Sequence, residues 1–334
     1  MGTSVASLGA SLPRQALVRF QADLDDVVAR ADDMVTRFTG LPTGGPPTRP
    51  WAMTRGDWVE RNLRGLESVV GPLSDHLFAR RPEGALSGAR RKLMGGQVGL
   101  LLGYLGRKVL GQYDLFLPPD DREVLYFVAP NIAAAEARFG FRPADFRLWI
   151  ALHEVTHRVQ FTGVPWLRRY VGDLIDTYLR SIDLDARRLA EGLRRLVEEA
   201  RSGGRWREMG WLYALLTPAQ QDVFRRMQAV MAVLEGHGNY VMDVVGEDVV
   251  EGAGRMRRVL HERRNRGGVD RFVQRAVGLD VKVRQYDLGQ RFILKVVERT
   301  GQEGFARVWE RPENLPTLEE VARPEAWVER VATA

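Results

Sequence analysis

The chain has 334 residues, and a content of 45% hydrophobic and 28% charged residues indicates a globular protein able to bury a sizeable core. It contains no cysteine, which excludes disulfides, cysteine nucleophiles and thiolate metal sites, so His, Asp and Glu must hold any bound metal. The net charge of +6 is moderate, and acidic residues are interspersed among the arginines, so charge alone does not predict a nucleic-acid-binding protein.

The first fifty residues predict a helix over Arg14–Phe38 and a Gly/Pro-rich linker over Thr39–Pro50. We therefore expect residues 1–50 to precede a main domain over 51–334, with a point near 202–217 where that domain could divide again. The N-terminus lacks the pattern of a signal peptide. The most apolar run, Leu93–Leu105, is much shorter than the roughly 18–20 residues that span a bilayer. The expectation is a cytoplasmic protein without a transmembrane span.

After the linker, apolar residues recur at three- and four-residue spacing, which is typical of helices that pack on a core. Two short stretches rich in β-branched and aromatic residues predict strands instead, at Tyr113–Leu117 and Val124–Ala129. The expected helices are Trp58–Ala79, Leu93–Val109, Arg142–Thr162, Pro165–Ser181, Leu184–Arg201, Pro218–Val245, Val269–Val277, Val281–Arg299 and Leu318–Val331. The sequence predicts a mostly α protein with one small β-sheet, of the α+β class.

The helix expected at 142–162 contains the sequence His153-Glu154-Val155-Thr156-His157. Two histidines four residues apart lie on one helix face, where both rings can reach one metal ion. Glu154 lies about 100° around the helix from His153, so it can approach a metal-activated water without being a ligand. The pattern predicts zinc binding by the two histidines, with Glu154 as the general base.

Through this HEVTH motif the sequence resembles the zincin metallopeptidases. Uncharged residues around the motif fit the extended zincin pattern, whereas Arg158 departs from it. A catalytic zinc site takes three protein ligands, and no histidine follows His157 at the spacing of the metzincin subgroup. The resemblance therefore implies the gluzincin arrangement, in which a glutamate on a later helix completes the site.

The later helix is expected at 218–245, and it contains the segment Val230–Asp243 (VMAVLEGHGNYVMD). Glu235 is the favoured third ligand, and His237 is the alternative, either as ligand or as a donor to the transition state. His237 also has apolar helical neighbours, so a core histidine is the other interpretation of this residue. Gly236 and Gly238 are poor helix formers, so their presence suggests close approach by another backbone or by substrate.

Together with Val283–Phe292 (VRQYDLGQRF), these segments resemble a bacterial group of zincin-like hydrolases, some of them linked to deazaflavin-coenzyme biosynthesis. The resemblance covers roughly residues 100 to 300 and implies a zincin-like fold with a metal site but no established substrate. In that light Tyr286 is a candidate for stabilising the oxyanion of a tetrahedral intermediate. An ordinary tyrosine at a helix surface is the alternative.

Two other signals carry less weight. His261-Glu262 starts like the motif, but no second histidine follows. The Arg-rich stretch Gly254–Arg275 has one aromatic residue and no nucleic-acid-binding motif, so we expect no nucleic-acid partner. A solvated helix-loop-helix, or a wall that attracts acidic substrates, is the expectation.

We expect an enzyme, a zinc-dependent hydrolase that acts on a peptide or a small amide. The alternative is a metal-binding zincin-like scaffold without peptidase activity, serving as a binding or assembly protein. The sequence does not predict the oligomeric state.

Overall fold

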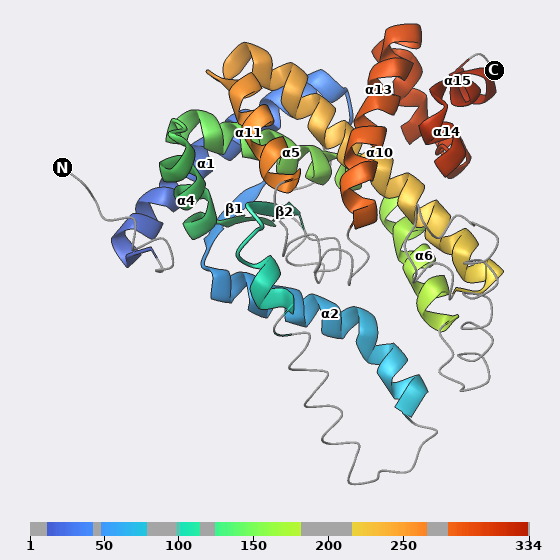
Figure 1. The fold of residues 1–334 in the computed structure, drawn as a ribbon, viewed down its shortest axis with the longest axis horizontal. Helices are drawn as coiled ribbons and strands as arrows, with labels where there is room; N and C mark the ends of the chain where they lie inside the picture. The colour runs from blue at the N-terminus through green and yellow to red at the C-terminus, as the bar shows by residue number, and fades with distance from the viewer. Residues whose placement is uncertain are drawn as a thin grey trace. The chain divides into compact units, whose positions relative to one another are not determined.

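Figure 1 shows the computed structural model of the chain, which describes residues 12–42, 48–78, 99, 101–113, 124–181, 216–265 and 280–332. These residues form mostly helices and one small sheet, as the sequence predicts. The contacts divide the chain into two compact units, residues 1–162 with 244–256, and residues 163–243 with 257–334. The division that we expect after residue 50 stays a prediction.

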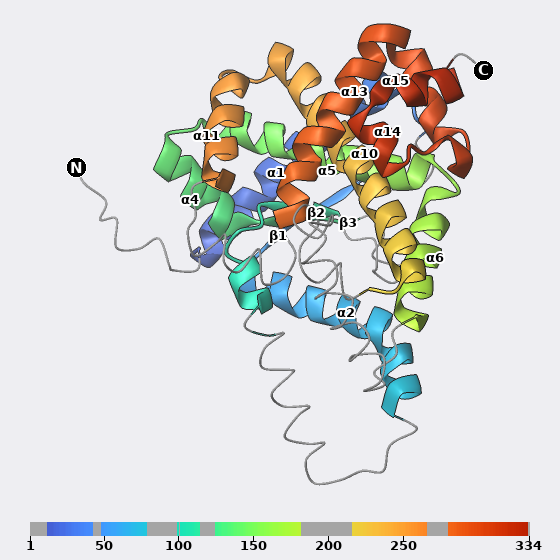
Figure 2. The ribbon, with the colours of Figure 1, turned by 45° about the vertical axis from the view of Figure 1, so that its right-hand side comes forward.

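The sheet of the first unit has three strands in the order β1-β3-β2. The central strand β3 (Val124–Val128) pairs in parallel with β1 (Arg49–Met53) and antiparallel with β2 (Gly111–Tyr113). All five side chains of β3 are buried, as in a strand that is covered on both faces. Figures 1 and 2 show the sheet with helix α2 (Arg55–Phe78) on one side and α1 (Arg14–Thr39) on the other.

Strand β1 corrects the prediction that the linker extends through Pro50. Proline has no N–H to donate, and β1 is an edge strand, so Pro50 costs the sheet no ladder hydrogen bond. The side chain of Gln21 on α1 covers this edge: it donates to the carbonyl of Pro50 and accepts from the N–H of Ala52, each at 2.8 Å. The sequence alone did not predict this strand, because the hydrogen bonds along its outer edge come from Gln21, which lies far away in the chain.

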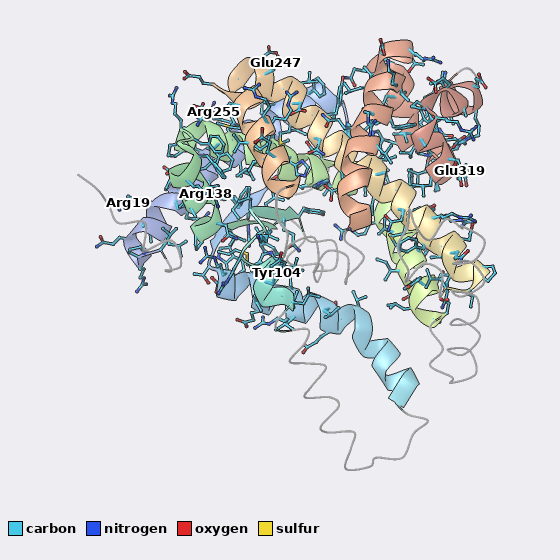
Figure 3. All side chains as sticks on the ribbon, in the orientation of Figure 1. Arg19, Tyr104, Arg138, Glu247, Arg255 and Glu319 are labelled. Atoms are coloured by element: carbon cyan, nitrogen blue, oxygen red, sulfur yellow. The ribbon has the colours of Figure 1, made fainter. Side chains whose placement is uncertain are left out.

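Strand β2 also differs from the prediction, since it covers Gly111–Tyr113, whereas the predicted strand begins at Tyr113. Residues 114–117 of that predicted strand lie outside the described residues. Helix α4 (Ala129–Phe139) begins where β3 ends and was not predicted. An arginine side chain binds the C-terminal end of α4. Arg255 of α11 (Ala253–Asn265), labelled in Figure 3, donates to the carbonyl of Phe139 at 2.5 Å.

The second unit contains α6 (Leu167–Arg180), most of α10 (Pro218–Val249) and α13 (Asp280–Ala306). Helices α10 and α13 cross with their backbones in direct contact. An added Cβ on Gly236 would lie 2.4 Å from the carbonyl carbon of Gly289, and one on Gly289 would lie 1.9 Å from the carbonyl oxygen of Ala232. The expectation that Gly236 marks close approach by another backbone is confirmed.

The last predicted helix, Leu318–Val331, is instead three short elements. They are α14 (Leu318–Ala322), α15 (Pro324–Trp327) and a π-helical turn at Val328–Ala332. The break lies at Arg323, whose φ of −133° and ψ of 78° are not helical, because the ring of Pro324 disfavours the α conformation in the preceding residue. The bend buries Trp327 completely, and its indole N–H donates to the carbonyl of Asn314 at 2.7 Å.

The other predicted helices agree with the structure to within a few residues where it describes them, except the one predicted at Val281–Arg299. Helix α13 continues beyond Arg299 to Ala306, past a non-helical residue at Gly301 (φ 71°, ψ 179°). The helices predicted at Leu184–Arg201 and Val269–Val277 lie outside the described residues. In the part of the chain that is described, no helix is both long enough and apolar enough to span a membrane.

Candidate metal centre

The HEVTH motif lies on α5 (Pro143–Gly163), as predicted. An apolar stripe fixes the rotation of this helix: Leu148, Leu152, Val155 and Val159 are all at most 2% exposed. Burying such a stripe contributes roughly 1.5–3 kcal/mol per side chain, so the helix cannot turn without losing much of its packing. The two histidines are partly buried beside this stripe.

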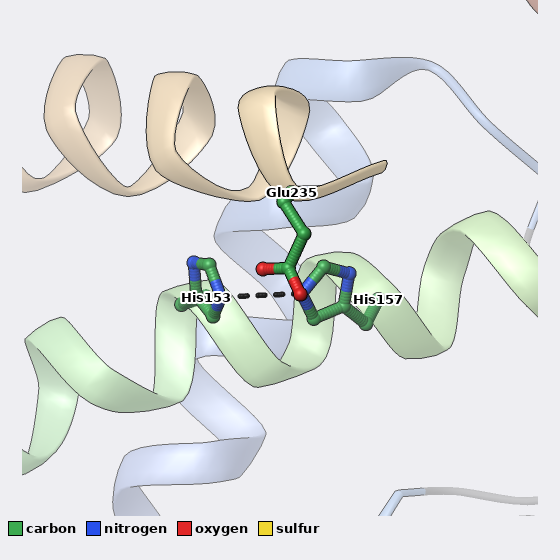
Figure 4. A group of neighbouring side chains, drawn as sticks. All are labelled: His153, His157 and Glu235. Atoms are coloured by element: carbon green, nitrogen blue, oxygen red, sulfur yellow. Dashed lines mark hydrogen bonds between the residues drawn. The ribbon is translucent and has the colours of Figure 1, made fainter. Parts of the chain in front are cut away.

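The rings of His153 and His157 face one point in space, as Figure 4 shows. Their Nε2 atoms lie 3.1 Å apart, and the ring planes are nearly perpendicular, at 87°. Two nitrogen ligands of a tetrahedral zinc ion, each about 2.0–2.1 Å from the metal, would be about 3.3 Å apart. The spacing of the two nitrogens therefore fits a shared cation.

A buried glutamine fixes the ring of His157. The side-chain oxygen of Gln160, a residue with no exposed surface, lies 3.0 Å from Nδ1 of His157. Because a carbonyl oxygen only accepts hydrogen bonds, His157 must donate from Nδ1, which leaves the lone pair on Nε2 for a metal. Sequence reasoning missed Gln160, although its place three residues after His157, on the same helix face, was a usable signal.

Removing this hydrogen bond should weaken metal binding. We expect Gln160→Ala to lower the zinc affinity by about 10- to 100-fold, because the ring of His157 is then free to turn away. Competition with a chromophoric chelator measures the affinity. Gln21→Ala is the control, since its side chain bonds to Asp25 and to the backbone of Pro50 and Ala52. Equal affinities in the two variants would contradict this role for Gln160.

The third donor comes from α10. Each of His153, His157 and Glu235 offers one ligand atom, and these three atoms lie within 4.8 Å of one another (Figure 4). All three side chains are partly buried. Two imidazoles and one carboxylate form a donor set that catalytic zinc sites use, and the absence of cysteine leaves no thiolate to compete. The residues present therefore fit the predicted metal.

His237 lies in a different environment. It is 3% exposed, and its ring packs against those of Phe305 and Trp309, with ring centres 5.3 Å away in both cases. It does not belong to the donor group of His153, His157 and Glu235. These contacts favour a packing role over the predicted roles of ligand or transition-state donor.

The structure describes the position of Tyr286 in α13, but its side chain lies outside the described residues. Its role at the oxyanion stays a prediction. A second tyrosine, Tyr240 of α10, is buried, and its hydroxyl accepts a hydrogen bond from Gln302 at 2.9 Å. Burial raises the pKa of Tyr240 by more than this hydrogen bond lowers it, so the hydroxyl stays protonated near neutral pH.

Arg158, which departs from the zincin pattern, has a structural explanation. The side chain is only 2% exposed, and its guanidinium donates to the carboxylate of Asp32 on α1 at 2.8 Å. The charge is thus buried and paired with a carboxylate.

In the described part of the stretch Gly254–Arg275, two arginines have partners within the chain. Arg255 donates to the end of α4, and Arg257 pairs with Asp243 at 2.9 Å. These contacts occupy two guanidinium groups that the sequence alone leaves available to a ligand.

The model of the zincin-like metallopeptidase family matches residues 3–328, which is nearly the whole chain. The chain belongs to this family. The chain is also similar to a protein from Chloroflexus aurantiacus whose crystal structure is described as that of a "putative hydrolase with a novel fold". The two chains are 32% identical with a TM-score of 0.72, over 96% of this chain and 92% of the other. No curated protein matches the sequence.

Membership of this zincin-like family and the likeness to that structure support a hydrolase with a metal site. The family match confirms the resemblance inferred from HEVTH and extends it beyond residues 100 to 300. The link to deazaflavin-coenzyme biosynthesis stays a prediction.

Proposed function

We propose that the chain is a zinc-dependent hydrolase of peptide or small amide bonds. The observation that carries the proposal is the group His153, His157 and Glu235, whose ligand atoms lie within 4.8 Å of one another. In this proposal the three side chains bind zinc. When bound, the ion supplies Lewis-acid chemistry, because it polarises a carbonyl and lowers the pKa of a neighbouring water to about 7.

In this proposal Glu154 is the general base. It neighbours His153 on α5, is 7% exposed and does not belong to the ligand group. In the proposed reaction its carboxylate takes a proton from the water that attacks the carbonyl carbon, and then gives that proton to the leaving nitrogen. Burial shields the carboxylate from bulk water, which strengthens its interactions with the reacting groups.

The natural substrate is expected to be a peptide or another small amide. The family to which the chain belongs is one of metallopeptidases, which supports an amide bond as the target. Arg158, the residue that departs from the zincin pattern, is buried and pairs with Asp32, so its charge is compensated within the chain.

Metal removal tests the proposal directly. Purified protein loaded with one equivalent of zinc should cleave members of a broad library of quenched-fluorescent peptides. Dialysis against a chelator should abolish cleavage, and added zinc should restore it. Cleavage that continues unchanged after complete metal removal would contradict the mechanism. Zinc-loaded protein that cleaves no peptide would instead favour the binding or assembly scaffold.

A further inference from the structure

Strand β2 has two faces with different contacts. On one face, the side chain of Gln112 accepts from the indole N–H of Trp58 at 2.7 Å and donates to Asn62 at 3.2 Å, both on α2. On the other face, the ring of Tyr113 stacks on that of Phe161 of α5, with centres 5.8 Å apart. Gly111 belongs to this second face, because side chains alternate along a strand.

The face of β2 that meets α5 reaches the proposed general base. A Cβ built on Gly111 would lie 2.7 Å from Cγ, 2.8 Å from Oε1 and 2.9 Å from Cδ of Glu154. Carbon atoms in ordinary contact stay about 3.5–4.0 Å apart, so the carboxyl group of Glu154 occupies the space of the missing side chain.

The backbone conformation at Gly111 does not itself require a glycine. Glycines with positive φ among the described residues are Gly40, Gly140, Gly252 and Gly301, and Gly111 is not one of them. An alanine could therefore adopt the same backbone conformation. What it could not do is leave the side chain of Glu154 where it lies.

We infer that Gly111 is a positioning residue, which lets the carboxylate of Glu154 lie directly against the backbone of β2. This inference rests on the proposed function, in which Glu154 is the general base. Strand β2 cannot easily retreat from an added methyl group, because it pairs with β3 on one edge and bonds to α2 through Gln112. The flexible end of Glu154 must move instead.

In an activity assay, Gly111→Ala should lower kcat by about 10- to 100-fold, because a displacement on the order of 1 Å at a catalytic group lowers the rate by this factor. The KM and the zinc affinity should stay close to those of the wild type, since the change moves the base and not the ligands. Gly172→Ala on α6 is the control: a Cβ there meets no atom within 4 Å, and kcat should not change. Unchanged kcat in Gly111→Ala would overturn the inference.

A thermal double-mutant cycle tests the same contact without any substrate. Gly111→Ala should lower the Tm in the wild-type background and leave it unchanged or raised in the Glu154→Ala background, where the carboxyl group is gone. An equal fall in both backgrounds, or a failure of both variants to fold, would overturn the inference. Recovery of folding only in the double variant would support it.

The two experiments distinguish a failure of the proposed function from a failure of the positioning role of Gly111. If the zinc-loaded wild type cleaves no peptide, the proposed function fails, while the thermal cycle still reports whether Gly111 makes room for Glu154. If the wild type is active and Glu154→Gln is inactive but Gly111→Ala is fully active, the positioning role alone fails.

Discussion

Replacing Glu154 by glutamine should lower kcat by about 100- to 10,000-fold while one zinc ion per chain stays bound. Glutamine keeps the size and hydrogen-bonding shape of the side chain but cannot take a proton from water. The carboxylate is buried and does not belong to the group of His153, His157 and Glu235, so its replacement leaves the three proposed ligands in place. Cleavage of a quenched-fluorescent peptide and zinc content by mass spectrometry are the two measurements.

Glu247→Gln is the matched control for this prediction. Glu247 is an exposed residue near the end of α10, labelled in Figure 3, and the same change of charge there should affect neither activity nor zinc content. Full activity in Glu154→Gln would exclude this residue as the base. Loss of zinc together with activity would instead indicate that Glu154 helps to bind the metal.

Replacing Gly236 by alanine should lower the free energy of unfolding by about 2 kcal/mol or more. The added Cβ would lie 2.4 Å from the carbonyl carbon of Gly289, and this contact involves backbone, which cannot rotate away. Helices α10 and α13 must therefore separate, although alanine by itself favours a helix by about 1 kcal/mol over glycine. Because Glu235 precedes Gly236, zinc affinity should fall as well.

Gly172→Ala is again the matched control, since it makes the same substitution in a helix with nothing within 4 Å of the new Cβ. It should leave the protein as stable or raise the free energy of unfolding by about 0.4–1 kcal/mol. Chemical unfolding in urea gives both values. A Gly236→Ala protein as stable as Gly172→Ala would show that the two helices can move apart without cost.

The sequence was sufficient to predict the features that depend on local pattern. The helix with His153 and His157 follows from its apolar stripe and from Pro143 and Gly163 at its ends. Glu235 was favoured as third donor because the resemblance to the gluzincins implies a glutamate on a later helix, and its ligand atom lies within 4.8 Å of those of both histidines. The close approach at Gly236 followed from the poor helix propensity of glycine.

The features that were missed depend on contacts between residues far apart in the chain. Strand β1 was assigned to the linker because Pro50 argues against a strand, and nothing in that segment indicates that Gln21 would complete its edge. Gly111 precedes Glu154 by more than forty residues, so no spacing rule connects the two. The break at Pro324 was a readable signal, and the periodic apolar pattern around it was given too much weight.

X-ray absorption spectroscopy at the zinc edge of the purified protein should show whether His153, His157 and Glu235 hold zinc. We expect one zinc ion per chain, with two imidazole nitrogens at about 2.0–2.1 Å and oxygen ligands at about 2.0–2.2 Å. In Glu235→Ala the imidazole signal should remain, while the oxygen shell changes and the affinity falls. Protein that binds no zinc, or a zinc spectrum without two imidazole ligands, would contradict the account.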